Sequence, residues 1–178
     1  MFWKIIFKLV LFSFLAVAQL SLASGLPFWL REINFLIIFM VFFLENNSNL
    51  NTVWWFVLVG FIFGLYQSSS FAFSLLFWPA VFLFCRFFYS NFLTNRSLYS
   101  FIGLTALTTW FYYLILNSAI YLNGLFLEEK VSLFLMHSSF WLSLLLGTVC
   151  NLGAVIIIFY FTNLASNRLK PVFIFRKK

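Results

Sequence analysis

Long apolar runs interrupted by short polar segments extend along most of this chain. The clearest case lies between Val53 and Tyr89, which reads VWWFVLVGFIFGLYQSSSFAFSLLFWPAVFLFCRFFY and is polar at Gln67–Ser70. As a single helix this stretch would be about 55 Å long, whereas the hydrocarbon core of a bilayer is about 30 Å thick. The pattern therefore predicts a helical hairpin, with two apolar limbs joined by a polar turn at Gln67–Ser70.

The first limb of this hairpin carries two glycines four residues apart, in the sequence Gly60-Phe-Ile-Phe-Gly64. Small residues at this spacing lie on one face of a helix and allow the backbone of a second membrane helix to approach closely. We expect Gly60 and Gly64 to lie at a contact between helices.

The N-terminal apolar run from Ile5 to Ala23 is long enough to cross a membrane, and Gly25 and Pro27 end it. With its basic start and small residues at Ala23-Ser24, it also fits a cleaved signal peptide. We favour a retained membrane helix. Gln19 lies within this run, and in lipid its amide requires a partner on a neighbouring helix.

The next run, from Ile33 to Leu44, would be only about 18 Å long as a helix, which is short for a membrane span. Two interpretations remain open. Either the helix begins earlier, near Pro27, with Arg31 extending to the interface, or the helix is only half inserted. A polar segment without basic residues, Glu45–Thr52, connects it to the hairpin.

After the hairpin, we expect a long helix from about Ser97 to about Leu122, with Asn95 or Thr94 as its N-cap. The final apolar run, from Val131 to Thr162, is again too long for one crossing, at about 48 Å.

We divide the final run at Met136–Ser139 into a short interfacial segment and a spanning helix from Phe140 to Thr162. We expect Pro171 to stop any helix in the tail that follows, because proline cannot donate a main-chain hydrogen bond.

Composition and charge make this a single integral membrane domain over residues 1–178, with a basic tail at 164–178. Hydrophobic residues make up 64% of the chain and charged residues 8%. With six crossings and the N-terminus inside, two of the 11 basic residues, Arg31 and Lys130, lie on the outer side. The other nine lie on the cytoplasmic side, so that the positive-inside rule places both termini in the cytoplasm: Lys4, Lys8, Arg86, Arg96, Arg168, Lys170, Arg176, Lys177 and Lys178.

The same arrangement argues against nucleic-acid binding, because the basic residues responsible for the net charge of +7 lie beside the ends of membrane helices. The lipid bilayer is the expected environment of this protein.

Residues suited to catalysis are sparse in this sequence. There is no Asp, the four Glu residues occur at predicted helix ends or loops, and His137 has no nearby acid or cysteine with which to form a catalytic pair or a metal site. We expect no catalytic residue, cofactor or metal, and a protein that is not an enzyme. Four polar residues within apolar runs are candidates for hydrogen bonds between helices: Gln19, Gln67, Asn117 and Asn151.

The stretch GFIFGLYQSSSFAFSLLFWPAVFLFCRFF, followed by FLTNRSLYSF and a long helix, resembles the rod shape-determining protein MreD family. The resemblance covers roughly Pro27 to Leu122. It departs from the family at the turn, where Gln67 replaces a common acidic residue and Ser69–Ala72 replaces a segment with small, Pro and Gly residues.

This resemblance implies a non-enzymatic scaffold of the cell-elongation machinery in a bacterial inner membrane. Such a scaffold would bind a single-span MreC-type partner and couple cytoplasmic filaments to peptidoglycan synthesis. The alternative is the membrane substrate-binding subunit of an energy-coupling-factor vitamin transporter, in which polar and aromatic groups would converge near the outer face.

Overall fold

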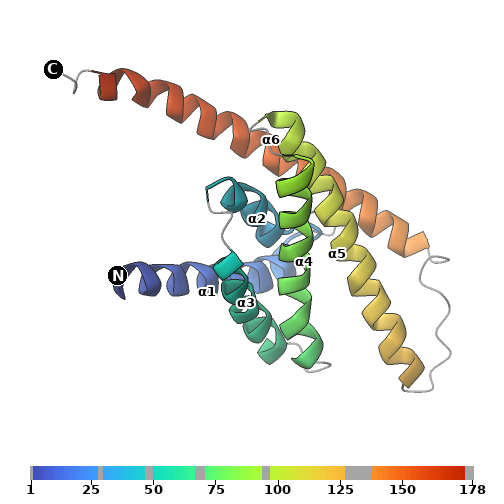
Figure 1. Ribbon diagram of the computed structural model, residues 1–178. Helices are drawn as coiled ribbons and strands as arrows, with labels where there is room; N and C mark the ends of the chain where they lie inside the picture. Colours follow the sequence, from blue (N-terminus) through green and yellow to red (C-terminus); the bar gives the residue numbers. More distant parts are fainter. Residues whose placement is uncertain are drawn as a thin grey trace.

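The computed structural model describes residues 2–27, 30–46, 50–66, 71–93, 97–126 and 138–174, and within these ranges it is all-helical, as the apolar runs predict. Six α-helices and one short 3-10 helix form the described part of the chain (Figure 1). They are α1 (Phe2–Gly25), α2 (Phe35–Asn46), η1 (Leu50–Thr52), α3 (Val53–Tyr66), α4 (Phe71–Asn91), α5 (Leu98–Phe126) and α6 (Ser138–Ile174).

Three of these helices are long and apolar enough to cross a membrane. The candidate spans are Phe73–Asn91 in α4, Leu98–Ala119 in α5 and Ser139–Leu164 in α6, whereas the apolar parts of α1, α2 and α3 are shorter. These helices are typical of a membrane protein. The number of crossings and their orientation remain predictions.

The predicted hairpin is formed by α3 and α4, which pack against each other more extensively than any other pair of helices. The turn itself, Gln67–Ser70, lies outside the described residues. Gly60 lies directly against the backbone of α4: a Cβ there would collide with the main-chain oxygen of Ser74 and lie 3.0 Å from Leu75 Cα. Gly64 is also buried. The close approach of α3 and α4 at Gly60 therefore depends on the absence of a side chain.

The short helix α2 lies at the centre of the bundle and contacts α1, α4, α5 and α6. Its consecutive residues Leu36, Ile37 and Ile38 are all buried, so α2 has no polar face. It begins at Phe35, and the predicted extension toward Pro27 is wrong. The Pro27 carbonyl instead accepts hydrogen bonds from the main-chain N–H groups of Leu30 and Arg31, at 2.9 and 3.0 Å, which closes a turn before α2.

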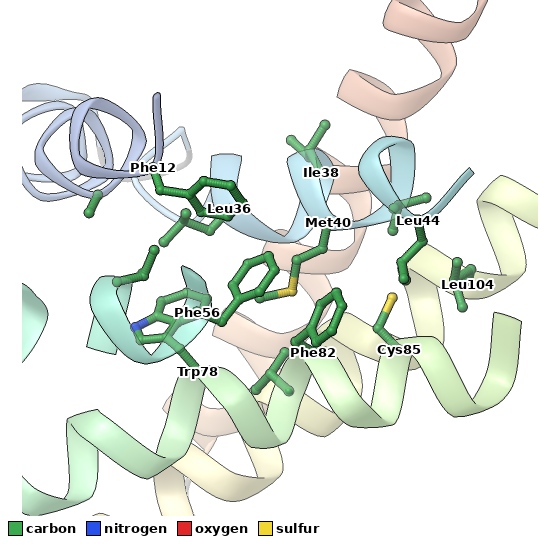
Figure 2. Close-up of a cluster of buried hydrophobic side chains, with 14 of the residues drawn as sticks. Phe12, Leu36, Ile38, Met40, Leu44, Phe56, Trp78, Phe82, Cys85 and Leu104 are labelled. Atoms are coloured by element: carbon green, nitrogen blue, oxygen red, sulfur yellow. The ribbon is translucent and has the colours of Figure 1, made fainter. Parts of the chain in front are cut away.

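Aromatic side chains join α1, α3 and α4 beneath α2, around Met40 (Figure 2). The ring of Phe12 in α1 meets the edge of Phe56 in α3 at 5.3 Å between centroids, and Phe56 stacks on Phe82 in α4 at 4.5 Å. Phe12 and Ala16 are fully buried in this core. Removal of α1 would therefore expose this core.

The boundaries of α5 differ slightly from those expected. The hydroxyl oxygen of Ser97 accepts a hydrogen bond from the main-chain N–H of Ser100 at 3.3 Å, so Ser97 caps the helix. The caps proposed from the sequence, Thr94 and Asn95, lie outside the described residues. At its other end α5 continues to Phe126, about one turn beyond Leu122.

The last helix, α6, begins at Ser138, close to the expected start, while the proposed interfacial segment before it lies outside the described residues. The expected stop at Pro171 is wrong, because α6 continues to Ile174. A proline in the last turn of a helix disturbs the hydrogen bonding of that turn and leaves the turns before it intact. In Figure 1 the C-terminal part of α6 extends away from the other helices.

Candidate functional site

Polar side chains from four parts of the chain converge around the beginning of α2, in an otherwise apolar bundle. Hydrogen bonds connect them to one another or to the backbone of residues 33–37. We call this group the polar cluster, and its members are Gln19 from α1, Glu32 and Asn34 before α2, Thr109 and Tyr113 from α5, and Ser143 and Asn151 from α6.

One part of the polar cluster satisfies the main-chain groups at the start of α2. The N–H of Phe35 donates to Gln19 Oε1 at 2.7 Å, and Gln19 Nε2 donates to the carbonyl of Ile33 at 3.1 Å. Asn34 acts as N-cap, because its Oδ1 accepts the N–H of Ile37 at 3.2 Å. The first N–H groups of any helix lack partners within that helix, and in an apolar environment each unpaired group costs several kcal/mol.

Asn151 connects this helix start to α5 and α6. Its Oδ1 accepts the main-chain N–H of Asn34 at 2.8 Å, and its Nδ2 donates to Thr109 Oγ1 at 3.2 Å. Both side chains are completely buried. Asn151 lies 12 residues after the start and 13 before the end of the Ser139–Leu164 span, so α2 begins near the middle of that span.

The position of the polar cluster explains how so short a helix can lie at the centre of a membrane bundle. As a helix of 12 residues, α2 is about 18 Å long. The chain before it is not helical, and non-helical backbone at membrane depth is stable only where protein covers it and supplies hydrogen-bond partners. Gln19, Asn34 and Asn151 supply such partners to the main chain.

The other part of the polar cluster surrounds the carboxylate of Glu32. The hydroxyl of Tyr113 donates to Glu32 Oε2 at 2.6 Å, and the hydroxyl of Ser143 donates to Oε1 over a longer 3.4 Å. Gly147 makes this arrangement possible. A Cβ at Gly147 would collide with the hydroxyl of Tyr113 and lie 2.7 Å from its Cε2 atom. The hydroxyl of Tyr113 can therefore reach Glu32 because α6 has no side chain at position 147.

The depth of Glu32 follows from its two partners. Tyr113 is one turn from Thr109, or about 6 Å along α5, and Ser143 is about 12 Å along α6 from Asn151. Thr109 and Asn151 lie near the middle of their candidate spans, and Glu32 lies within about 15 Å of that middle along the helices, which is half the thickness of a hydrocarbon core. Glu32 lies in the turn before α2, as expected for a Glu at a helix end or in a loop. The turn that carries it is folded into the bundle.

The four polar residues selected from the sequence have different environments. Gln19 and Asn151 make the expected hydrogen bonds to other segments. Asn117 instead donates to the main-chain carbonyl of Tyr113 in its own helix, at 2.9 Å. Gln67 lies outside the described residues, as does His137.

A regular spacing in the sequence indicates several members of the polar cluster that were not selected as candidates. Thr109 and Tyr113 are four residues apart in α5, and Ser143, Gly147 and Asn151 follow the same spacing in α6. Residues at this spacing share one helix face, so two polar stripes on neighbouring helices predict a contact. Glu32 has no such periodic signal, because it lies in a turn.

The chemistry available to the polar cluster is hydrogen bonding and the charge of one carboxylate. Among the residues that the structure describes, no three His, Cys, Asp or Glu side chains lie together as metal ligands. Comparison with known proteins found no matching family model, no matching curated protein and no matching solved structure.

Proposed function

We propose that this protein is a non-enzymatic membrane scaffold of the bacterial cell-elongation machinery, located in the inner membrane, as its resemblance to the MreD family implies. In this role it binds a single-span MreC-type protein and couples cytoplasmic filaments to peptidoglycan synthesis. The observation that best supports a scaffold is the exposure of α6. Only 22% of its span is buried against the rest of the chain, compared with 39% for the spans of α4 and α5.

One face of α6 is suited to a second membrane helix. Leu145, Val149 and Ile157 are exposed at 60%, 67% and 57%, and Gly153 lies between them at the same four-residue spacing. A Cβ at Gly153 would meet no atom within 4 Å. We call these four residues the outer face of α6. Because membrane helices associate through close packing at small residues, this face could accept the helix of a partner.

The scaffold hypothesis predicts that a bitopic membrane protein co-purifies with the wild-type chain in mild detergent. Gly153→Leu should reduce this capture about tenfold or more, because a bulky side chain prevents close approach of the partner backbone. The measurement is quantitative mass spectrometry of the captured proteins. Val10→Trp, at an exposed position of α1, is the matched control and should capture the partner normally.

A second experiment on the same hypothesis uses the living cell. Depletion of the protein from a rod-shaped host should produce round cells while vitamin uptake continues. Normal rods after depletion, or purification without any bitopic partner, would contradict the scaffold function.

The second candidate function, a vitamin-binding transporter subunit, is favoured by one observation. Glu32, Tyr113 and Ser143 converge from three segments toward the end of the bundle that the charge distribution assigns to the outer side. This function predicts that an ATPase module co-purifies with the chain and that its depletion abolishes uptake of one vitamin.

Membrane topology is tested separately. We expect reporter fusions at Asn47, Ser69, Asn91, Glu128 and Lys178 to report inside, outside, inside, outside and inside, because of the nine-to-two distribution of basic residues. Alkaline phosphatase and green fluorescent protein fusions give the two complementary signals. An outside signal at Lys178 would disprove the six-crossing arrangement.

A further inference from the structure

A half-buried carboxylate inside a membrane bundle requires compensation of its charge. Glu32 is partly buried, and in the described part of the chain both of its hydrogen-bond donors are neutral hydroxyl groups. The hydrogen bond from the Tyr113 hydroxyl to Oε2, at 2.6 Å, is the shorter of the two. Ionisable groups at this depth are costly unless they are paired, and they usually mark a functional site.

Three oxygen atoms at this site can each accept a hydrogen bond: Oε1 of Glu32 and the hydroxyl oxygens of Ser143 and Tyr113. Oε1 of Glu32 receives only the long 3.4 Å bond from Ser143, so it can accept a stronger one. The hydroxyl oxygens of Ser143 and Tyr113 use their protons toward Glu32 and keep lone pairs for a further donor. A primary ammonium group has three N–H donors, no acceptor and one positive charge.

We infer that Glu32, Tyr113 and Ser143 form a binding site for a primary ammonium group. The ligand is either the headgroup of an aminophospholipid such as phosphatidylethanolamine or a free small amine. Arg31 is exposed on the same turn, where its guanidinium can contact the phosphate of a lipid, whereas its positive charge opposes the binding of a free amine. This site is distinct from the outer face of α6, and its existence does not depend on the scaffold function.

The test uses the full chain, purified in mild detergent, with native mass spectrometry and thermal unfolding as readouts. Phosphatidylethanolamine should bind about tenfold more tightly than phosphatidylcholine, whose trimethylammonium group has no N–H donor. Stepwise N-methylation of the headgroup should weaken binding progressively. Equal binding of all headgroups by the wild-type chain, together with no binding of free ethanolamine, would overturn the inference, and would do so even if the variants failed to fold.

The variants locate the site and identify the source of the ammonium group. Glu32→Gln should remove the preference for phosphatidylethanolamine, whereas Glu45→Gln, which changes the other carboxylate near α2, should retain it. Arg31→Gln should weaken lipid binding if the ligand is a lipid, and it should leave ethanolamine binding at least as strong, because it removes a nearby positive charge. A preference for free ethanolamine without any lipid preference identifies a small amine. A Glu32→Gln protein that still selects phosphatidylethanolamine would disprove the assignment.

Discussion

Replacement of Asn151 by Leu is expected to lower the free energy of unfolding by about 2 to 3 kcal/mol, more than any other single change in the polar cluster. Leucine fills a similar volume but removes both hydrogen bonds of the amide. The main-chain N–H of Asn34 and the hydroxyl of Thr109 would then lose a partner in a completely buried region. The measurement is unfolding by SDS in mixed micelles, followed by circular dichroism.

Asn117→Leu is the matched control for this experiment. It is the same substitution in a candidate span, but among the described residues the Asn117 amide bonds to the carbonyl of Tyr113 in its own helix, and that carbonyl can keep its helical hydrogen bond. We expect a loss of less than about 0.5 kcal/mol. If the two variants were equally stable, the polar cluster would not hold the start of α2.

The positions of the helices along the chain were largely predictable from the pattern of apolar and polar residues, whereas the end of α6 beyond Pro171 was not. The hairpin of α3 and α4 is one example, because a polar turn between two apolar runs has few alternatives in a membrane. The role of α2 was not predictable. Its short apolar run left two interpretations open, an earlier start near Pro27 or a half-inserted helix, whereas its central position depends on contacts with four other helices that no local pattern encodes.

In the polar cluster, some of the side chains were predictable from the sequence, whereas their hydrogen-bond partners were not. Gln19 and Asn151 were identifiable because an amide within an apolar run requires a partner. The partners themselves were not identifiable from the sequence. Gln19 bonds to the main chain of residues 33 and 35, and Asn151 bonds to the main chain of Asn34. Every residue except proline has a main-chain N–H group, so the sequence does not indicate which of these groups a side chain will bind. Glu32 lies in a turn, as expected, and only the folded structure brings that turn to Tyr113.

Substitution of Gly60 by Ala is expected to destabilise the hairpin by about 2 kcal/mol, and Gly60→Leu by more. Even one methyl group would collide with the main-chain oxygen of Ser74 and press against Leu75 Cα. Both are backbone atoms of α4, which cannot move aside by a change of rotamer, so α3 and α4 would have to separate. That separation would also disturb the stacking of Phe56 on Phe82.

Gly153→Ala provides the matched comparison, because it is the same change in a helix where a Cβ meets no atom within 4 Å. Alanine favours the helix over glycine by up to about 1 kcal/mol, so this variant should be as stable as the wild type or more stable. SDS unfolding in mixed micelles measures both variants. If Gly60→Ala were stabilising like Gly153→Ala, then α3 and α4 would not be in close contact at Gly60, and the hairpin geometry would be wrong.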